Sequence, residues 1–227
     1  MRSPARVAIY YAPLPDDPLT RLSSAWLGRD PITNAPVRQP GLNGIAEITA
    51  EPRNYGFHAT LKPPMRLTAG ADWADFIAAV RAIAVEIAPF ELPPLAVADL
   101  RGFLALRETI PCVKLESLAD TCVEQLDSFR APLSDDELAR RRKSKLSPEQ
   151  DAMLVRWGYP YVFGTWFFHL TLTRRLSDAE KSSILPAAES WFAPALAAPR
   201  RVEDICIFTQ AAPNAAFTLA ERLRLRG

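Results

Sequence analysis

The chain has two histidines, and each is followed two positions later by a threonine. His58 and Thr60 lie in the segment NYGFHATLKPP, and His169 and Thr171 lie in the segment TWFFHLTLTRR. In both segments a phenylalanine directly precedes the histidine, and a leucine follows it three positions later. A lone histidine on a strand is most often a satisfied structural residue. Two matched histidines about half a chain length apart indicate instead that they work together.

These residue types suit acid–base chemistry at phosphorus. A neutral imidazole can accept a proton from an attacking water or hydroxyl, while a protonated imidazole donates one to the leaving oxygen. An unperturbed histidine pKa of about 6.5 lets both forms coexist near neutral pH. Threonine hydroxyls can donate hydrogen bonds to the non-bridging oxygens as charge develops. This route needs no metal, and two histidines with dispersed carboxylates supply no clustered ligand set.

Two similar series of elements are predicted to position the histidines. The first series contains a strand at 6–13, a helix at 17–28, a long loop with one short helical turn at 29–53, a histidine strand at 57–62 ended by Pro63 and Pro64, a helix at 71–88, and strands between 90 and 108. The second contains a strand at 110–117, a helix at 118–130, a polar basic segment at 134–160, a histidine strand at 165–173, a helix at 177–193, and a strand hairpin at 202–210 and 216–225.

This repeated order predicts one bilobal domain of the α+β class over residues 1–227. We expect a duplicated fold in which two antiparallel sheets face a central cleft and helices lie on the outside. The lobes are expected at approximately 1–109 and 110–227, and the pattern allows strands to be exchanged between them. A chain of 227 residues is long enough to bury a substantial core.

Side chains alternate across a strand, which sorts the two histidine strands into faces. One face of each strand is apolar and predicted to lie in the core: Phe57, Ala59 and Leu61 in the first strand, and Phe168, Leu170 and Leu172 in the second. The opposite faces carry the histidines and threonines. If the two strands face one another across the cleft, two imidazoles and two hydroxyls surround a site that a tetrahedral phosphate fits.

Five further side chains are candidates for binding the substrate: Lys62, Thr173, Tyr10, Tyr55 and Tyr159. Lys62 and Thr173 share the histidine faces of their strands, although a lysine at a strand end is also a common surface residue. Tyr10 lies opposite the apolar face of its strand, and Tyr55 precedes the first motif. Tyr159 belongs to RWGYPYVF, an aromatic turn that can stack a base or ribose. Tyr55 is placed to cap the pocket, and packing is the alternative interpretation of Tyr10 and of the aromatic turn.

Composition and charge favour a compact substrate. The hydrophobic content of 48% and the charged content of 23% are ordinary for a globular protein, and the formal net charge of +1 gives no field that attracts a long polyanion. The basic run RRRKSK at 140–145 is typical of a solvated helix end or loop, or meets the phosphates of a nucleic-acid end. We therefore expect a small phosphodiester as partner, keep a short RNA end open, and expect no long nucleic acid.

The remaining sequence features indicate a cytoplasmic protein without a membrane partner. Cys112, Cys122 and Cys206 are scattered, form no C-x-x-C motif and are odd in number, which argues against a disulfide framework. No apolar run reaches the roughly 18–20 residues of a membrane span, and MRSPARVAIYY lacks the apolar region and cleavage site of a signal peptide.

The paired, strand-borne H-x-T motifs resemble those of the two-histidine (2H) phosphoesterase superfamily, which has a bilobal α+β fold. Its members include RNA-end cyclic phosphodiesterases and ligases of the LigT type, and cyclic-nucleotide phosphodiesterases. More narrowly, YGFHATLKPP with RWGYPYVF and FHLTLT resembles an uncharacterised 2H family encoded in phosphonate-utilisation (carbon–phosphorus lyase) operons. The resemblance implies reaction at a cyclic or linear phosphodiester without a cofactor, with His58 and His169 as the acid–base pair and Thr60 and Thr171 as phosphate binders.

Three functions remain compatible with the sequence. The first is a metal-independent phosphodiesterase acting on a small sugar phosphate or nucleotide, tied to phosphonate metabolism. The second is an RNA-end 2′,3′-cyclic phosphodiesterase or RNA ligase, against which the near-zero net charge weighs. The third is a non-enzymatic nucleotide-binding module. Retention of both histidines and both threonines argues against the third function, because binding alone needs donors and no acid–base pair.

Overall fold

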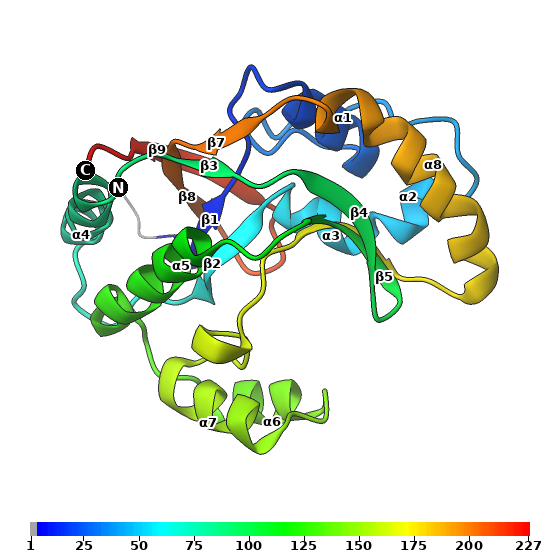
Figure 1. The fold of residues 1–227 in the computed structure, drawn as a ribbon. Coiled ribbons are helices and arrows are strands. Elements are labelled where there is room, and N and C mark those ends of the chain that lie inside the picture. Colours follow the sequence, from blue (N-terminus) through cyan, green and yellow to red (C-terminus); the bar gives the residue numbers. More distant parts are fainter. Residues whose placement is uncertain (1–3) are drawn as a thin grey trace.

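The computed structural model describes residues 4–227, which form eight α-helices and nine strands (Figure 1). The helices are α1 (Pro18–Leu27), α2 (Ile45–Ile48), α3 (Ala50–Tyr55), α4 (Trp73–Glu86), α5 (Val113–Gln125), α6 (Asp135–Arg142), α7 (Pro148–Trp157) and α8 (Asp178–Leu196), with 3-10 turns η1 (Asp127–Phe129) and η2 (Phe163–Thr165). The strands are β1 (Arg6–Tyr11), β2 (Ala59–Met65), β3 (Phe90–Leu92), β4 (Leu95–Leu100), β5 (Phe103–Glu108), β6 (Leu170–Arg175), β7 (Arg200–Val202), β8 (Asp204–Gln210) and β9 (Phe217–Arg224).

All strand pairs are antiparallel, which confirms the predicted α+β class. The sheets have the strand orders β2-β1-β8-β9, β4-β5-β6 and β3-β7. The predicted hairpin near the C-terminus is formed by β8 and β9, and it completes the sheet that begins with β1. Each of the two larger sheets therefore contains strands from both sides of residue 110. The division into lobes at that residue stays a prediction.

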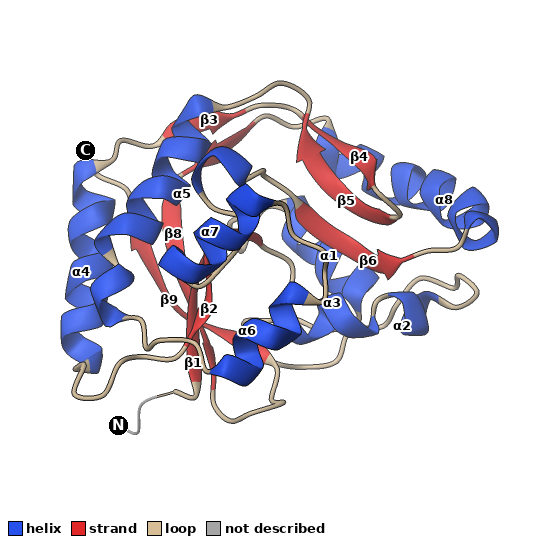
Figure 2. Ribbon diagram, turned by 90° about the horizontal axis from the view of Figure 1, so that it is seen from below, coloured by secondary structure: helices blue, strands red, loops and turns tan. Residues whose placement is uncertain are grey.

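Helices cover the outer side of each larger sheet. Helices α4 and α5 pack on the four-stranded sheet, whereas α1 and α8 pack on one another and on the three-stranded sheet. Figure 2 shows these two groups on opposite sides of the molecule, with α6 and α7 in front of the space between them. Among residues 4–227 there is no helix that combines the length and the apolar character needed to cross a membrane.

The apolar faces predicted from alternation are confirmed. The six side chains assigned to the core are each at most 3% exposed: Phe57, Ala59, Leu61, Phe168, Leu170 and Leu172. They belong to one hydrophobic core that also takes in the inner faces of α1, α4, α5 and α8. Burial of apolar surface is the main stabilising contribution to folding, so this core holds the two histidine strands in place.

Local sequence signals explain where the helices begin and end. Ser134, Ser147 and Ser177 each open a capping box with Glu or Gln three residues later, so they start α6, α7 and α8. Helix α1 starts after Asp17, whose carboxylate accepts a backbone N–H of the first turn. It ends at Gly28, whose φ of +81° suits glycine. The predicted helices at 17–28 and 177–193 are thereby confirmed.

The predicted strand at 110–117 is wrong, because the chain forms helix α5 from Val113 onward. The buried side chains of this helix follow helical spacing: Leu115, Leu118, Ala119, Cys122 and Val123. Val113, whose β-branched side chain suggested a strand, is 71% exposed. The second histidine strand pairs with β5, just as the first pairs with β1.

Two further predictions need correction around the first histidine. The predicted loop at 29–53 contains the short helix α2 and most of α3. The first histidine strand does not end before Pro63 and Pro64, since β2 continues through both prolines to Met65. β2 is the edge strand of its sheet, and its pairing with β1 is irregular between Lys62 and Met65, so the missing N–H groups of the two prolines are tolerated there. Both histidines stand one residue before their strands, β2 and β6.

Candidate active site

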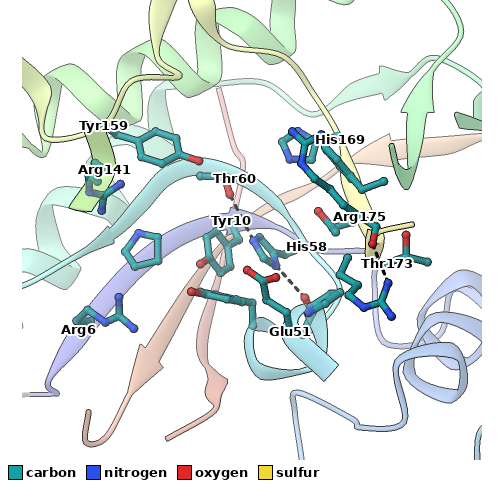
Figure 3. Close-up of a pocket in the computed structure, with 17 residues that line it drawn as sticks. Arg6, Tyr10, Glu51, His58, Thr60, Arg141, Tyr159, His169, Thr173 and Arg175 are labelled. Carbon is teal, nitrogen blue, oxygen red and sulfur yellow. Dashed lines mark hydrogen bonds between the residues drawn. The ribbon is translucent and has the colours of Figure 1, made fainter. Parts of the chain in front are cut away.

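Both H-x-T motifs border one cavity of about 380 Å³ between the two larger sheets (Figure 3). Its lining combines β1 and β2 of the four-stranded sheet with β5 and β6 of the three-stranded sheet, together with residues of α3, α6 and the segment after α7. His58, Thr60, His169 and Thr171 all contribute to it. The structure therefore brings together the four residues that the sequence pairs only by pattern.

A backbone carbonyl two residues upstream holds each imidazole. His58 Nδ1 lies 2.8 Å from the carbonyl oxygen of Gly56, and His169 Nδ1 lies 3.1 Å from that of Phe167. A carbonyl oxygen can only accept, so Nδ1 of each ring carries a hydrogen and donates it. Nε2 is therefore the atom of each ring that can exchange a proton. The hydroxyl Oγ1 of Thr60 lies 3.4 Å from His58 Nε2.

Aromatic rings fix the planes of both imidazoles. The ring of Tyr10 stacks on His58, with centroids 3.6 Å apart and planes inclined by 20°. Phe167 stacks on His169, with centroids 4.6 Å apart and planes inclined by 25°. Phe103 meets the ring of His169 edge-on at 5.9 Å. Since each ring is held both by its Nδ1 hydrogen bond and by a stacked neighbour, the direction of its Nε2 lone pair is set in advance.

The surroundings favour the neutral form of both histidines. Burial lowers the pKa of His58 to about 4, against the opposing effect of the Gly56 carbonyl, and His169 lowers it further. Burial also lowers the pKa of His169; the Phe167 carbonyl opposes this decrease and the charge of Arg107 adds to it. A phosphate anion beside the two rings would raise both pKa values and so allow one ring to take up a proton.

Lys62 does not line this cavity, which corrects its predicted position on the substrate face. Its ammonium is buried, donates to the carbonyl oxygen of Val123 at 2.9 Å, and lies 3.5 Å from Asp127 Oδ1. Burial lowers the pKa of Lys62 to about 8, against the opposing charge of Asp127. The side chain therefore ties β2 to the C-terminal end of α5 rather than to a substrate.

A bulge in β2 explains this position. Tyr10 of β1 pairs with Thr60, whereas the preceding residue, Ile9, pairs with Lys62. One extra residue of β2 is thus inserted between Thr60 and Lys62, and the alternation changes phase there. Thr60 shares the cavity face with Tyr10, while Lys62 joins Ile9 on the opposite face.

Thr173 does line the cavity, and its hydroxyl also completes the sheet. Its Oγ1 accepts the backbone N–H of Leu104 at 3.0 Å. The pairing of β6 with β5 becomes irregular after Thr171, and this side chain replaces a backbone acceptor at the irregularity. Both histidine strands therefore lose their regular register directly after the threonine of the H-x-T motif.

The three predicted tyrosines, Tyr10, Tyr55 and Tyr159, also line the cavity. The ring of Tyr55 stacks on Phe217, with centroids 5.5 Å apart. Tyr159 lies beneath the guanidinium of Arg141, whose Cζ is 5.4 Å from the ring centroid. The hydroxyl of Tyr10 is buried and has no hydrogen-bond partner.

Four arginines also line the cavity: Arg6, Arg141, Arg174 and Arg175. Strand alternation could have placed Arg6 at the cavity, because Arg6 lies on the same face of β1 as Tyr10. Arg141 belongs to the basic run at 140–145, but only the position of α6 in the fold brings it to the cavity. The guanidinium of Arg174 is already paired, at 2.6 Å with Glu47 and at 3.0 Å with Glu180.

Comparison with known protein families assigns this chain to one of them. Residues 60–218 match the family described as "Protein of unknown function (DUF1045)", and the chain belongs to that family.

Two curated relatives are named ribose 1,5-bisphosphate phosphokinase PhnN. The relative from Janthinobacterium sp. (strain Marseille) is 39% identical over 99% of this chain and 52% of its own length. The relative from Laribacter hongkongensis (strain HLHK9) is 38% identical over 94% and 50%. The chain thus spans about half the length of the curated relatives it matches.

Solved structures with a similar fold include LigT of E. coli. Its complex with 3′-AMP is 13% identical, with 99% of this chain and all of that chain covered and a TM-score of 0.47. The apo form of LigT is 16% identical, with full coverage of both chains and a TM-score of 0.45. TT0787 of Thermus thermophilus is also 16% identical, with 98% of both chains covered and a TM-score of 0.45.

Proposed function

We propose that this chain is a metal-independent phosphodiesterase that acts on a cyclic (or linear) phosphodiester of a small sugar phosphate or nucleotide. His58 and His169 are its general acid–base pair. One observation carries the proposal: each imidazole donates through Nδ1 to a carbonyl and lines the same cavity, so each has Nε2 left for proton transfer. A pair held in this way can take one proton and give another at a single phosphorus centre.

The proposed hydrolysis balances in one turnover. Water attacks phosphorus while one histidine takes a proton from it through Nε2. The bond from phosphorus to one sugar oxygen breaks, and the second histidine gives its proton to that oxygen. The product is a phosphomonoester, and solvent then restores the two protonation states. Thr60 and Thr171 donate to the non-bridging oxygens, on which negative charge develops.

The substrate class is proposed from the size of the cavity and from the relatives. A volume of about 380 Å³ suits a compact sugar phosphate or nucleotide. The name of the curated relatives, ribose 1,5-bisphosphate phosphokinase, supports a small sugar phosphate, and the resemblance to the phosphonate-operon family supports a place in phosphonate metabolism. The proposal includes a cytoplasmic location and no long nucleic-acid partner.

A screen of cyclic phosphates in EDTA tests this proposal. We expect the purified chain to convert at least one small cyclic phosphate of ribose or of a mononucleotide to its monoester. The rate, measured by ³¹P NMR, should be the same with and without EDTA. Asparagine variants of the two histidines, purified identically, control for contaminating phosphodiesterases. Strict metal dependence, or nucleotide binding without any turnover, would refute the proposed chemistry. Preferential cleavage of RNA 2′,3′-cyclic ends would favour the RNA-end alternative.

The pH dependence follows from the lowered pKa values. The base must be neutral and the acid protonated, so the plot of kcat/KM against pH should be bell-shaped. Because the two histidines interact, the two apparent pKa values of this plot describe the pair and not the individual residues. Burial lowers the pKa of His58 to about 4 and that of His169 below its usual value, so both limbs should titrate below about pH 6.5. In the kcat profile the bound phosphate raises both pKa values, which shifts the bell to higher pH. A basic limb of kcat/KM above about pH 8 would contradict this account.

A further inference from the structure

Part of the cavity wall lies beyond Tyr10, on the side away from His169, and carries two arginines (Figure 3). Arg6 begins β1 and shares a face with Tyr10, while Arg141 comes from α6. Both arginines line this cavity. Burial lowers the pKa of Arg141; Tyr159 and Glu137 oppose this decrease, whereas Arg140 and, as the smallest effect, Arg6 add to it. Two like charges in one wall are unfavourable unless an anion lies between them.

Neither arginine forms an ion pair with a carboxylate among the described residues, although Glu137 is near enough to oppose the lowering of the pKa of Arg141. The ion pairs within residues 4–227 include neither Arg6 nor Arg141, although Glu51 also lines the cavity. Arg6 donates through Nε to the neutral amide of Gln210 at 2.7 Å, and its guanidinium lies over the ring of Phe217. Their positive charge is therefore available to an anion in the cavity.

Unpartnered polar atoms occur in the same place. The side chain of Tyr10 is fully buried, yet its hydroxyl has no hydrogen-bond partner. The Nε atom of Arg141 is also buried and without a partner. Buried polar groups are nearly always hydrogen-bonded, and each one left unpaired is unfavourable. Both residues line the cavity that holds the histidines.

We name this group of side chains the arginine–tyrosine cluster: Arg6, Arg141, Tyr10 and Tyr159. We infer that the arginine–tyrosine cluster binds a second phosphate group of the substrate, a phosphomonoester separate from the phosphodiester between the histidines. Two guanidinium groups and two phenol hydroxyls supply charge and several donors to its terminal oxygens. The inference rests on the proposed function and narrows its substrate class to cyclic phosphodiesters of a sugar that also carries a phosphate.

Inorganic phosphate tests the cluster independently of turnover. In a calorimetric titration we expect the full chain to bind two phosphates. The Arg141→Gln variant should bind only one, and so should a second variant, Arg6→Gln. Arg142→Gln is the matched control, because Arg142 lies on the same helix but pairs with Asp151 on α7. Binding of one phosphate or none by the wild type, or two by both cluster variants, would overturn the inference.

Kinetics provide the second measurement. Adenosine 2′,3′-cyclic phosphate with and without a 5′-phosphate forms a matched pair of substrates. We expect the wild type and Arg142→Gln to prefer the 5′-phosphorylated compound in kcat/KM, and Arg141→Gln to reduce that preference by about 10- to 100-fold. An unchanged preference in Arg141→Gln would count against the cluster. Loss of the second phosphate in Arg141→Gln, with no turnover of any cyclic phosphate by the wild type, would keep the cluster and refute the hydrolase.

Discussion

Replacement of His58 or His169 by asparagine is expected to lower kcat by about 10²- to 10⁴-fold, the usual contribution of a positioned acid or base. The asparagine amide can still donate to the carbonyl of Gly56 or Phe167, as the Nδ1 hydrogen does now. It has no counterpart of Nε2 that takes or gives a proton at neutral pH. The loss should therefore appear in kcat, measured by steady-state kinetics on the substrate found in the screen, while KM changes little.

Two further experiments, a double variant and a substrate with a better leaving group, test whether the histidines act together and which of them is the acid. Because both histidines act in one step, the double asparagine variant should cost scarcely more than the worse single variant. With a 4-nitrophenyl phosphodiester the leaving group needs no proton, so the variant of the acid should recover most of its activity and the variant of the base should not. Unchanged thermal unfolding controls for misfolding. A single variant that retains more than about a tenth of the wild-type kcat would exclude that histidine as acid or base.

The candidate site was predictable from the sequence as far as strand alternation holds. His58 and Thr60 are two residues apart, as are His169 and Thr171, and within that distance alternation places each pair around the cavity. The prediction for Lys62 is wrong because a bulge intervenes directly after Thr60. A bulge arises from the pairing of β2 with β1, so the sequence of β2 alone carries no sign of it.

Residues that arrive from distant segments could not be placed in the same way. The capping box that starts α6 is visible in the sequence, yet nothing local shows that this helix brings Arg141 to the cavity. The strands β8 and β9 were recognisable as a hairpin, but their position beside β1 depends on pairing across most of the chain. For α5, β-branched residues near its start suggested a strand, whereas the helical spacing of its buried residues determines the structure.

Trp26→Ala is expected to lower the free energy of unfolding by about 3–5 kcal/mol, the usual cost of removing a large buried aromatic side chain. The indole is fully buried, lies 5.5 Å from the ring of Phe192 and 6.4 Å from that of Trp191, and so joins α1 to α8. Its Nε1 also donates to the carbonyl oxygen of Leu172 at 3.1 Å. This carbonyl belongs to β6, three residues after His169, so the same side chain supports the second histidine strand.

Two comparisons separate the contributions to this loss. Trp26→Phe keeps most of the packing but leaves the Leu172 carbonyl without the indole N–H, and it should cost about 1–3 kcal/mol. Trp73→Ala is the matched control, because Trp73 is only half-buried and stands at the start of α4, so its loss should be smaller than that of Trp26→Ala. Chemical denaturation measures all three variants. If Trp26→Ala costs no more than Trp73→Ala, then the contact between α1 and β6 does not stabilise the second histidine strand, and its support must come from β5 and from the helices α2 and α3 that pack on it.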